Sequence, residues 1–104
     1  MVLHSLIWII IWINNINIMK SVNEVVLRIH TELMHQQGIS QDSNEELEIR
    51  PKNGITSSTI VSFLLDLEDE LDIQLDRYLP EIRVRKTIGA FIKIIEKACS
   101  EQGK

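Results

Sequence analysis

The sequence predicts a small all-α protein, a bundle of three to four helices, and three observations point to this fold class. Apolar side chains recur at four- and three-residue spacing in three separate segments, which is the period of a helix with one buried face. Residues that favour helix N-caps stand at the start of each segment. Each helix would have one apolar face, and packing the three faces together gives a small bundle.

The first predicted helix begins at Ser21-Val22-Asn23-Glu24, a capping box in which the serine and the glutamate close the first turn. Its apolar stripe has four-three-four spacing and consists of Val22, Val26, Ile29 and Leu33. Gly38 can adopt the left-handed conformation that ends a helix, so we expect the end near residues 36–38. Residues 39–55 hold neither helical nor strand periodicity and are expected to form a long ordered loop, which in so small a domain is often functional.

The second predicted helix begins at residues 56–59, four consecutive Thr and Ser residues that are all good N-caps. Its expected core stripe, flanked by Val61 and Phe63, is Ile60, Leu64, Leu67 and Leu71. An advance of about 100° per residue places a second group on the opposite arc of the helix, namely Ser58, Ser62, Leu65, Asp66 and Asp69. We therefore expect Leu65 to be exposed among polar side chains.

Two further elements complete the predicted bundle. Pro80 limits the segment before it to a short turn or a single-turn helix. Thr87 caps the last helix, which buries Ile88, Phe91, Ile92 and Ile95. The expected order is therefore three substantial helices, with a long loop after the first and a short helix before the last.

The first 19 residues differ from the rest, because they carry none of the 26 charged side chains and hold both Trp residues. The apolar run in this stretch is shorter than the roughly 20 residues of a membrane span and lacks the cationic start of a secretory signal. Residues 1–18 are expected to be a leader outside the fold, most simply translated upstream sequence, with membrane attachment as the alternative. Residues 19–100 form the predicted domain, and residues 101–104 form a tail.

Composition and spacing exclude several classes of site. A net charge of −4 argues against nucleic-acid binding, and a single cysteine, Cys99, excludes a disulfide framework or a multi-cysteine metal site. His30 and His35 are five residues apart rather than four, so we interpret them as surface histidines and predict no metal site. Because no acid–base pair or nucleophile with its base can be assembled, we predict that the protein is not an enzyme and has no catalytic residues.

Two segments resemble the acyl carrier protein family. In that family a Gly-x-Asp-Ser-Leu motif opens the second helix, and the present chain has Gly54-Ile55-Thr56-Ser57-Ser58 at the same place. The end of the family's second helix is matched by Leu67-Glu68-Asp69-Glu70-Leu71-Asp72-Ile73. The start of its last helix is similar to Thr87-Ile88-Gly89-Ala90-Phe91-Ile92. The resemblance covers roughly residues 19–98, and it implies the same helix order as the periodicity predicts.

The resemblance implies a carrier of 4'-phosphopantetheine, attached from coenzyme A by a phosphopantetheinyl transferase. Aligning the end of the second helix places the attachment serine at Ser57, with Ser58 as the second choice. The arm would carry acyl groups as thioesters between enzymes, in cytoplasmic fatty-acid biosynthesis or related lipid metabolism. The motif differs from the family's at Thr56, where Asp is usual, and at Ser58, where Leu is usual.

Charge is unevenly distributed over the predicted domain. Residues 66–76 hold six acids and no base, whereas the chain from Arg77 onward has seven bases and three acids. An acidic patch would steer and orient partner enzymes with basic surfaces, and Leu65 would be its apolar anchor. The predicted docking surface consists of Gly54, Ile55, Ser58, Ser62, Leu65, Glu68 and Asp69. An alternative is a solvated face partly neutralised by Arg83, Arg85 and Lys86.

Two other functional hypotheses stay open on the sequence. One is a specialised carrier for polyketide or peptide pathways, and the other is a carrier-fold interaction module that is not modified. For the carrier we expect a monomer that binds neither nucleic acid nor membranes. We also expect its aliphatic core to shelter an acyl chain between the helices.

Overall fold

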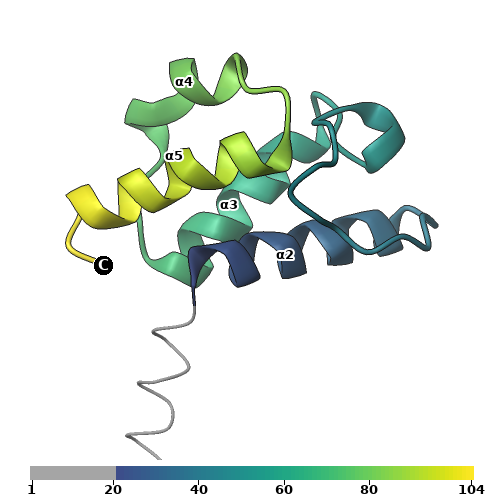
Figure 1. Cartoon of the computed structure of the whole chain (residues 1–104), viewed down its shortest axis with the longest axis horizontal. Coiled ribbons are helices and arrows are strands. Elements are labelled where there is room, and N and C mark those ends of the chain that lie inside the picture. Colours follow the sequence, from purple (N-terminus) through teal and green to yellow (C-terminus); the bar gives the residue numbers. More distant parts are fainter. Residues whose placement is uncertain (1–20) are drawn as a thin grey trace, which may run out of the picture.

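The computed structural model describes residues 21–104, and this part of the chain folds into four α-helices without a strand, as predicted. The helices are α2 (Val22–Gln36), α3 (Thr59–Leu71), α4 (Leu79–Arg83) and α5 (Ile88–Glu101) (Figure 1). Two short 3-10 turns, η1 (Pro51–Asn53) and η2 (Asp76–Tyr78), lie in the connections. The leader predicted over residues 1–18 lies outside the described residues.

The first helix begins and ends where its local signals predict. The Ser21 hydroxyl accepts a hydrogen bond of 3.3 Å from the Glu24 N–H, so Ser21 is the N-cap of α2. Gly38 follows the helix with a φ of 81°, a conformation that is open to glycine at little cost. Helix α2 buries Val26, Ile29 and Leu33, three of the four residues predicted for its apolar stripe.

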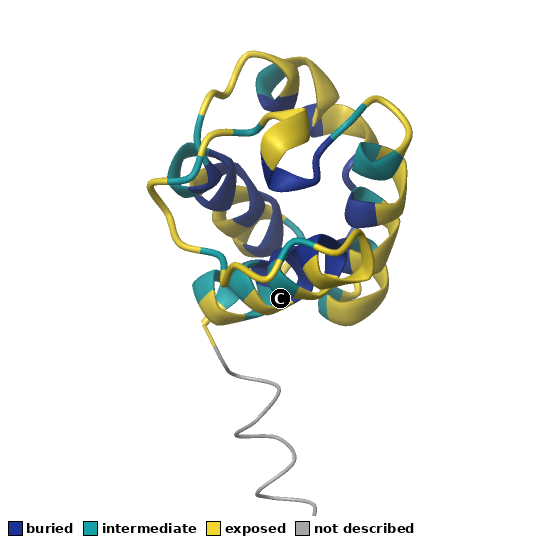
Figure 2. Ribbon diagram, turned by 90° about the vertical axis from the view of Figure 1, so that its right-hand side faces the viewer, coloured by how far each residue is buried: buried dark blue, intermediate teal, exposed yellow. Residues whose placement is uncertain are grey.

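The core lies between α2, α3 and α5, which turn their buried faces toward one another (Figure 2). The rings of Phe63 and Phe91 are central to it, with centroids 5.3 Å apart and a tilt of 31°. Around them pack the Ile, Leu and Val side chains of the three helices, including the predicted Ile88, Ile92 and Ile95 of α5. This packing of one apolar face from each helix is the bundle that the periodicity predicts.

The long loop between α2 and α3 is ordered because it pairs with the start of α5. The N–H groups of Ile88 and Gly89 donate to the carbonyl oxygens of Leu47 and Glu45, at 2.9 and 2.8 Å. The loop returns the interaction where the Ile49 N–H donates to the carbonyl of Lys86, at 2.9 Å. These bonds satisfy the first backbone donors of α5, which a helix cannot satisfy within itself.

Residues 101–104, predicted as a tail, are part of the folded domain. Helix α5 continues through Glu101, which accepts a hydrogen bond from the Tyr78 hydroxyl. Gln102 exchanges two hydrogen bonds with the backbone of Gln74, at 2.8 and 2.7 Å. The Lys104 ammonium lies 2.8 Å from the Asp72 carboxylate and lowers the pKa of that carboxyl group. The last residues therefore close over the connection between α3 and α4.

Candidate functional site

The entry to α3 is a capping box built from two threonines. The Thr56 hydroxyl accepts the N–H of Thr59 at 3.1 Å, and the Thr59 hydroxyl accepts the N–H of Thr56 at 2.7 Å. The N–H of Ile60 donates to the Thr56 carbonyl at 2.9 Å, so helical bonding already starts at Thr56. Of the four predicted caps, the structure thus assigns the role to Thr56 and places Ser57 and Ser58 in the first turn.

The two serines of this turn differ in their surroundings. Both are exposed, but the Ser58 hydroxyl lies 3.1 Å from the hydroxyl of Thr56 and shares a hydrogen bond with it. Within residues 21–104, the Ser57 hydroxyl has no hydrogen-bond partner, and neither serine N–H is bonded to a backbone carbonyl. Ser57 therefore presents a free hydroxyl next to unpaired backbone donors at a helix start, a setting that favours a negatively charged group.

The loop that leads to Ser57 is fixed to α2 and α3 through Gly54. The Gly54 carbonyl accepts two hydrogen bonds, from the Gln37 amide at 2.8 Å and from the Thr59 hydroxyl at 2.7 Å. Gly54 has a φ of 83°, and an added Cβ would lie only 3.0 Å from the Gln37 side chain. Gly54 is buried, and Ile55 is only 5% exposed. The prediction of these two residues as docking surface is therefore wrong, because the turn into α3 directs them into the protein.

His30 is likewise buried, with 0% exposure, and its prediction as a surface histidine is wrong. Its Nε2 lies 2.8 Å from the Asn53 carbonyl oxygen and its Nδ1 lies 2.6 Å from the Ser43 hydroxyl. A carbonyl only accepts, so Nε2 carries the proton and a neutral Nδ1 accepts from Ser43. Burial lowers the pKa of His30, and the Asn53 carbonyl partly opposes this effect. His30 is therefore a neutral clamp between α2 and the loop, whereas His35 is exposed as predicted.

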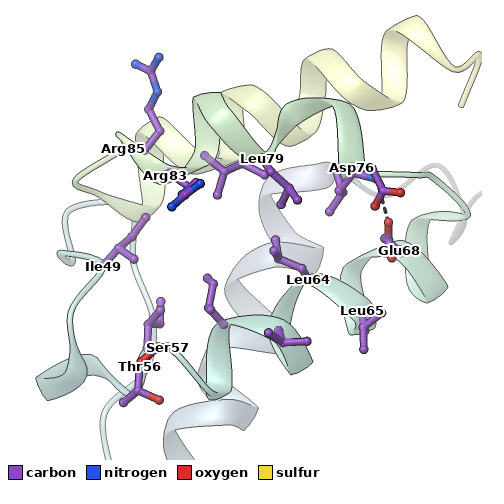
Figure 3. Close-up of a pocket in the computed structure, with 15 residues that line it drawn as sticks. Ile49, Thr56, Ser57, Leu64, Leu65, Glu68, Asp76, Leu79, Arg83 and Arg85 are labelled. Atoms are coloured by element: carbon purple, nitrogen blue, oxygen red, sulfur yellow. Dashed lines mark hydrogen bonds between the residues drawn. The ribbon is translucent and has the colours of Figure 1, made fainter.

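An apolar cavity of about 590 Å³ opens between α3 and α4, and Ser57 lies at its rim (Figure 3). Its walls are mainly aliphatic side chains of both helices and the connection between them, including Ile60, Leu64, Leu75, Leu79 and Ile82. A cavity of this size and composition is typical of small-molecule sites. The structure thus contains an apolar space beside the predicted attachment residue.

The cavity also explains why the predicted core stripe of α3 is rotated. The helix buries Phe63 and Leu67, whereas the predicted Ile60 and Leu64 are only half-buried and line the cavity. Val61, predicted to flank the core, is 56% exposed. Helical periodicity identifies an apolar side of α3, but it does not say which part of that side faces α2 and α5 and which part faces α4.

The predicted docking face of α3 is exposed along most of its length. Leu65 is 54% exposed, and Ser62 and Asp69 are exposed beside it. Glu68 is different, because it is half-buried and its carboxylate accepts the N–H of Leu75 at 2.8 Å, which fixes the turn after the helix. The sequence did not single out Val61, which lies one turn before Leu65 and extends the apolar part of this face.

The acids of α3 are neutralised only in part, and by other partners than predicted. Arg28 of α2 lies 2.8 Å from Glu70, and Lys104 pairs with Asp72. Within residues 21–104, Asp66 and Asp69 have no ion-pair partner. None of the ion pairs in this part of the chain joins an α3 acid to Arg83, Arg85 or Lys86. An acidic and unpaired surface therefore remains beside Leu65.

Other chemistry-bearing groups are not organised as sites in the described part of the chain. Cys99 is buried, and burial raises the pKa of its thiol, which disfavours the reactive thiolate. Residues 21–104 contain no cluster of three or more His, Cys, Asp or Glu side chains that could hold a metal ion. They also contain no helix with the length and hydropathy to span a bilayer.

A scan against protein-family models, a search of curated proteins and a search of solved structures each found no match to this chain. The resemblance to acyl carrier proteins therefore depends on the quoted motifs alone.

Proposed function

We propose that this protein is an acyl carrier that bears 4'-phosphopantetheine on Ser57 and is not itself an enzyme. The observation that carries the proposal is the position of Ser57, an exposed hydroxyl in the first turn of α3 and at the rim of an apolar cavity. A carrier needs a hydroxyl that a modifying enzyme can reach and a place for the apolar cargo near it. Both features meet at this residue.

Electrostatics at the start of α3 support a phosphodiester at Ser57. The positive end of the helix dipole and unpaired N–H groups stabilise a negative charge by roughly 0.3–1 kcal/mol at an exposed site. The start of α5 is a useful contrast, because loop carbonyls occupy its first N–H groups. Of these two helix starts, only that of α3 has free backbone donors beside an exposed serine.

The Thr56 capping box supports the assignment in spite of the altered motif. In the family an Asp is usual at this position, and Asp and Thr are both good N-cap residues. Thr56 fulfils this structural role through its bonds with Thr59 and thereby sets the direction of the first turn. The change to Thr removes a carboxylate that a transferase could contact, but it preserves the geometry of the serine that follows.

The cavity supports alkyl acyl groups as cargo and fatty-acid biosynthesis as the pathway. Its aliphatic walls would stabilise each buried CH₂ of a chain by about 0.8 kcal/mol. The bundle already has space between α3 and α4, so the core need not part to admit a chain. A polyketide or peptide carrier remains the alternative pathway, and it would carry a more polar cargo.

The exposed face of α3 is the proposed docking surface for the transferase and for acyl-transferring enzymes. Leu65 and Val61 provide an apolar centre, and Asp66 and Asp69 provide unpaired negative charge around it. This combination fits a basic partner surface, on which charges set the approach and an apolar anchor sets the affinity.

The test is the intact mass of the full chain after incubation with coenzyme A and a broad-specificity phosphopantetheinyl transferase. We expect one phosphopantetheine increment on the wild-type protein and on the Ser58→Ala variant, and none on Ser57→Ala. An increment that persists in Ser57→Ala would contradict the assigned residue. No increment with several transferases would contradict the carrier and favour an unmodified interaction module.

A further inference from the structure

The two ends of the cavity between α3 and α4 carry opposite charge. Arg83, at the end of α4, lies beside Ile49 at the end of the cavity that also holds Ser57 (Figure 3). Glu68 and Asp76 lie at the other end, where α3 and η2 face each other. The apolar walls of Leu64 and Leu79 separate these ends. A ligand in this cavity therefore meets a cation at one end and carboxylates at the other.

Arg83 is the cation available for a ligand. Within residues 21–104 its guanidinium has neither an ion pair nor a hydrogen bond, although it lines an apolar cavity. Arg85 also reaches the cavity rim, but its Nε donates to the Glu81 carbonyl at 3.2 Å and its guanidinium points away from the cavity in Figure 3. Glu81, the acid nearest in sequence, is paired with Lys97 at 3.1 Å.

We propose that the cavity is a non-covalent binding site for a free fatty acid, with its carboxylate on Arg83 and its alkyl chain between α3 and α4. This inference goes beyond the carrier function and does not depend on the modification of Ser57. The direction of the ligand follows from charge, because Glu68 and Asp76 would repel a carboxylate at the opposite end. A guanidinium and a carboxylate form strong, geometrically matched hydrogen bonds, so Arg83 selects an anionic head group.

The walls of the cavity fit the chain of such a ligand. Leu64, Leu79 and Ile82 offer aliphatic surface along the space between the charged ends. A volume of about 590 Å³ lies within the range of pockets that enclose small ligands. The ligand class is therefore a carboxylate with an unbranched apolar chain, which shares no covalent bond with the protein.

The experiment is a calorimetric titration of the unmodified full chain with decanoate below its micelle concentration, and with decanol as the neutral analogue. We expect decanoate to bind more tightly than decanol, and Arg83→Gln to weaken decanoate binding about tenfold while leaving decanol unchanged. Lys93→Gln is the matched control, because it removes one positive charge from α5 outside this cavity and should leave both affinities unchanged.

The same titration can overturn the inference in three ways. Equal affinity for decanoate and decanol, or no binding of either, would show that Arg83 and the cavity do not form the site. An equal loss in Lys93→Gln would show attraction by overall charge instead of a specific contact. The Ser57→Ala variant should bind decanoate as the wild type does, so the failure of covalent modification and the failure of this site are separate results.

Discussion

Replacing His30 by Leu should destabilise the protein by about 2 kcal/mol, because the buried Asn53 carbonyl then loses its donor. The carbonyl belongs to a residue that is only 5% exposed, so water does not readily replace the imidazole. An unsatisfied buried acceptor costs roughly 1–3 kcal/mol. Leucine keeps most of the apolar contact with Phe63, whose ring centroid lies 5.8 Å from that of His30, so the hydrogen bond dominates the loss.

The assay is urea unfolding of the full chain followed by circular dichroism, at a pH where histidine is neutral. The matched control is His35→Leu on the same helix, since the His35 side chain is 50% exposed and should change the free energy of unfolding by less than about 0.5 kcal/mol. Hydrogen exchange at Ile55 should also accelerate in His30→Leu, because Asn53 and Gly54 hold the turn that precedes α3. Equal stability of the two variants would refute the role of His30 as a clamp.

Three further predictions follow from the same structure. Thr56→Ala should lower the free energy of unfolding by about 1 kcal/mol in urea titrations, and Ser58→Ala by less, since only the Thr56 hydroxyl caps the helix N–H; equal losses would contradict this assignment. Leu67→Ala should cost about 3 kcal/mol in thermal or urea unfolding, whereas Leu65→Ala should cost less than about 0.5 kcal/mol, because Leu67 is 0% and Leu65 54% exposed; comparable losses would refute the orientation of α3. Wild-type stability should fall as the pH drops below about 6.5, because burial lowers the pKa of His30 in the folded state and the unfolded chain takes up the proton first; the part due to His30 should be complete above that pH and absent in His30→Leu.

Local signals predicted the elements of the fold because they act within a few residues. The Ser21 box and the Thr87 cap mark the starts of α2 and α5, and both hydroxyls accept the expected N–H bonds. Gly38 and the region around Pro80 likewise end or limit helices through backbone geometry that a single residue imposes. The helix order and the ordered loop follow from these signals.

Features that depend on tertiary contacts were not predictable from the sequence. His30 is buried because Asn53, 23 residues later, brings its carbonyl to the imidazole, and no local pattern records that contact. The core face of α3 is rotated because α4 stands away from Ile60 and Leu64 and leaves a cavity. Arg28 was not considered as the partner of Glu70, because the two residues meet only when α2 packs on α3.

The candidate site was predicted in part. Ser57, Leu65 and Asp69 are exposed as expected, because they lie on the outer arc of α3 or in its first turn. Gly54 and Ile55 are buried, since the loop turns inward before the helix starts. The hydroxyl contact that distinguishes Ser58 from Ser57 depends on the rotamer of Thr56, which sequence spacing does not specify.

The most direct test of the account is to locate the modification within the tryptic peptide of residues 53–77, which lies between Lys52 and the cleavage after Arg77. After treatment with coenzyme A and a transferase, fragment-ion spectra should place the phosphopantetheine group on Ser57 and leave Ser58 and Ser62 unmodified. An unmodified peptide, or a group located on Ser58, would contradict the claim that the first turn of α3 presents Ser57 as the attachment residue.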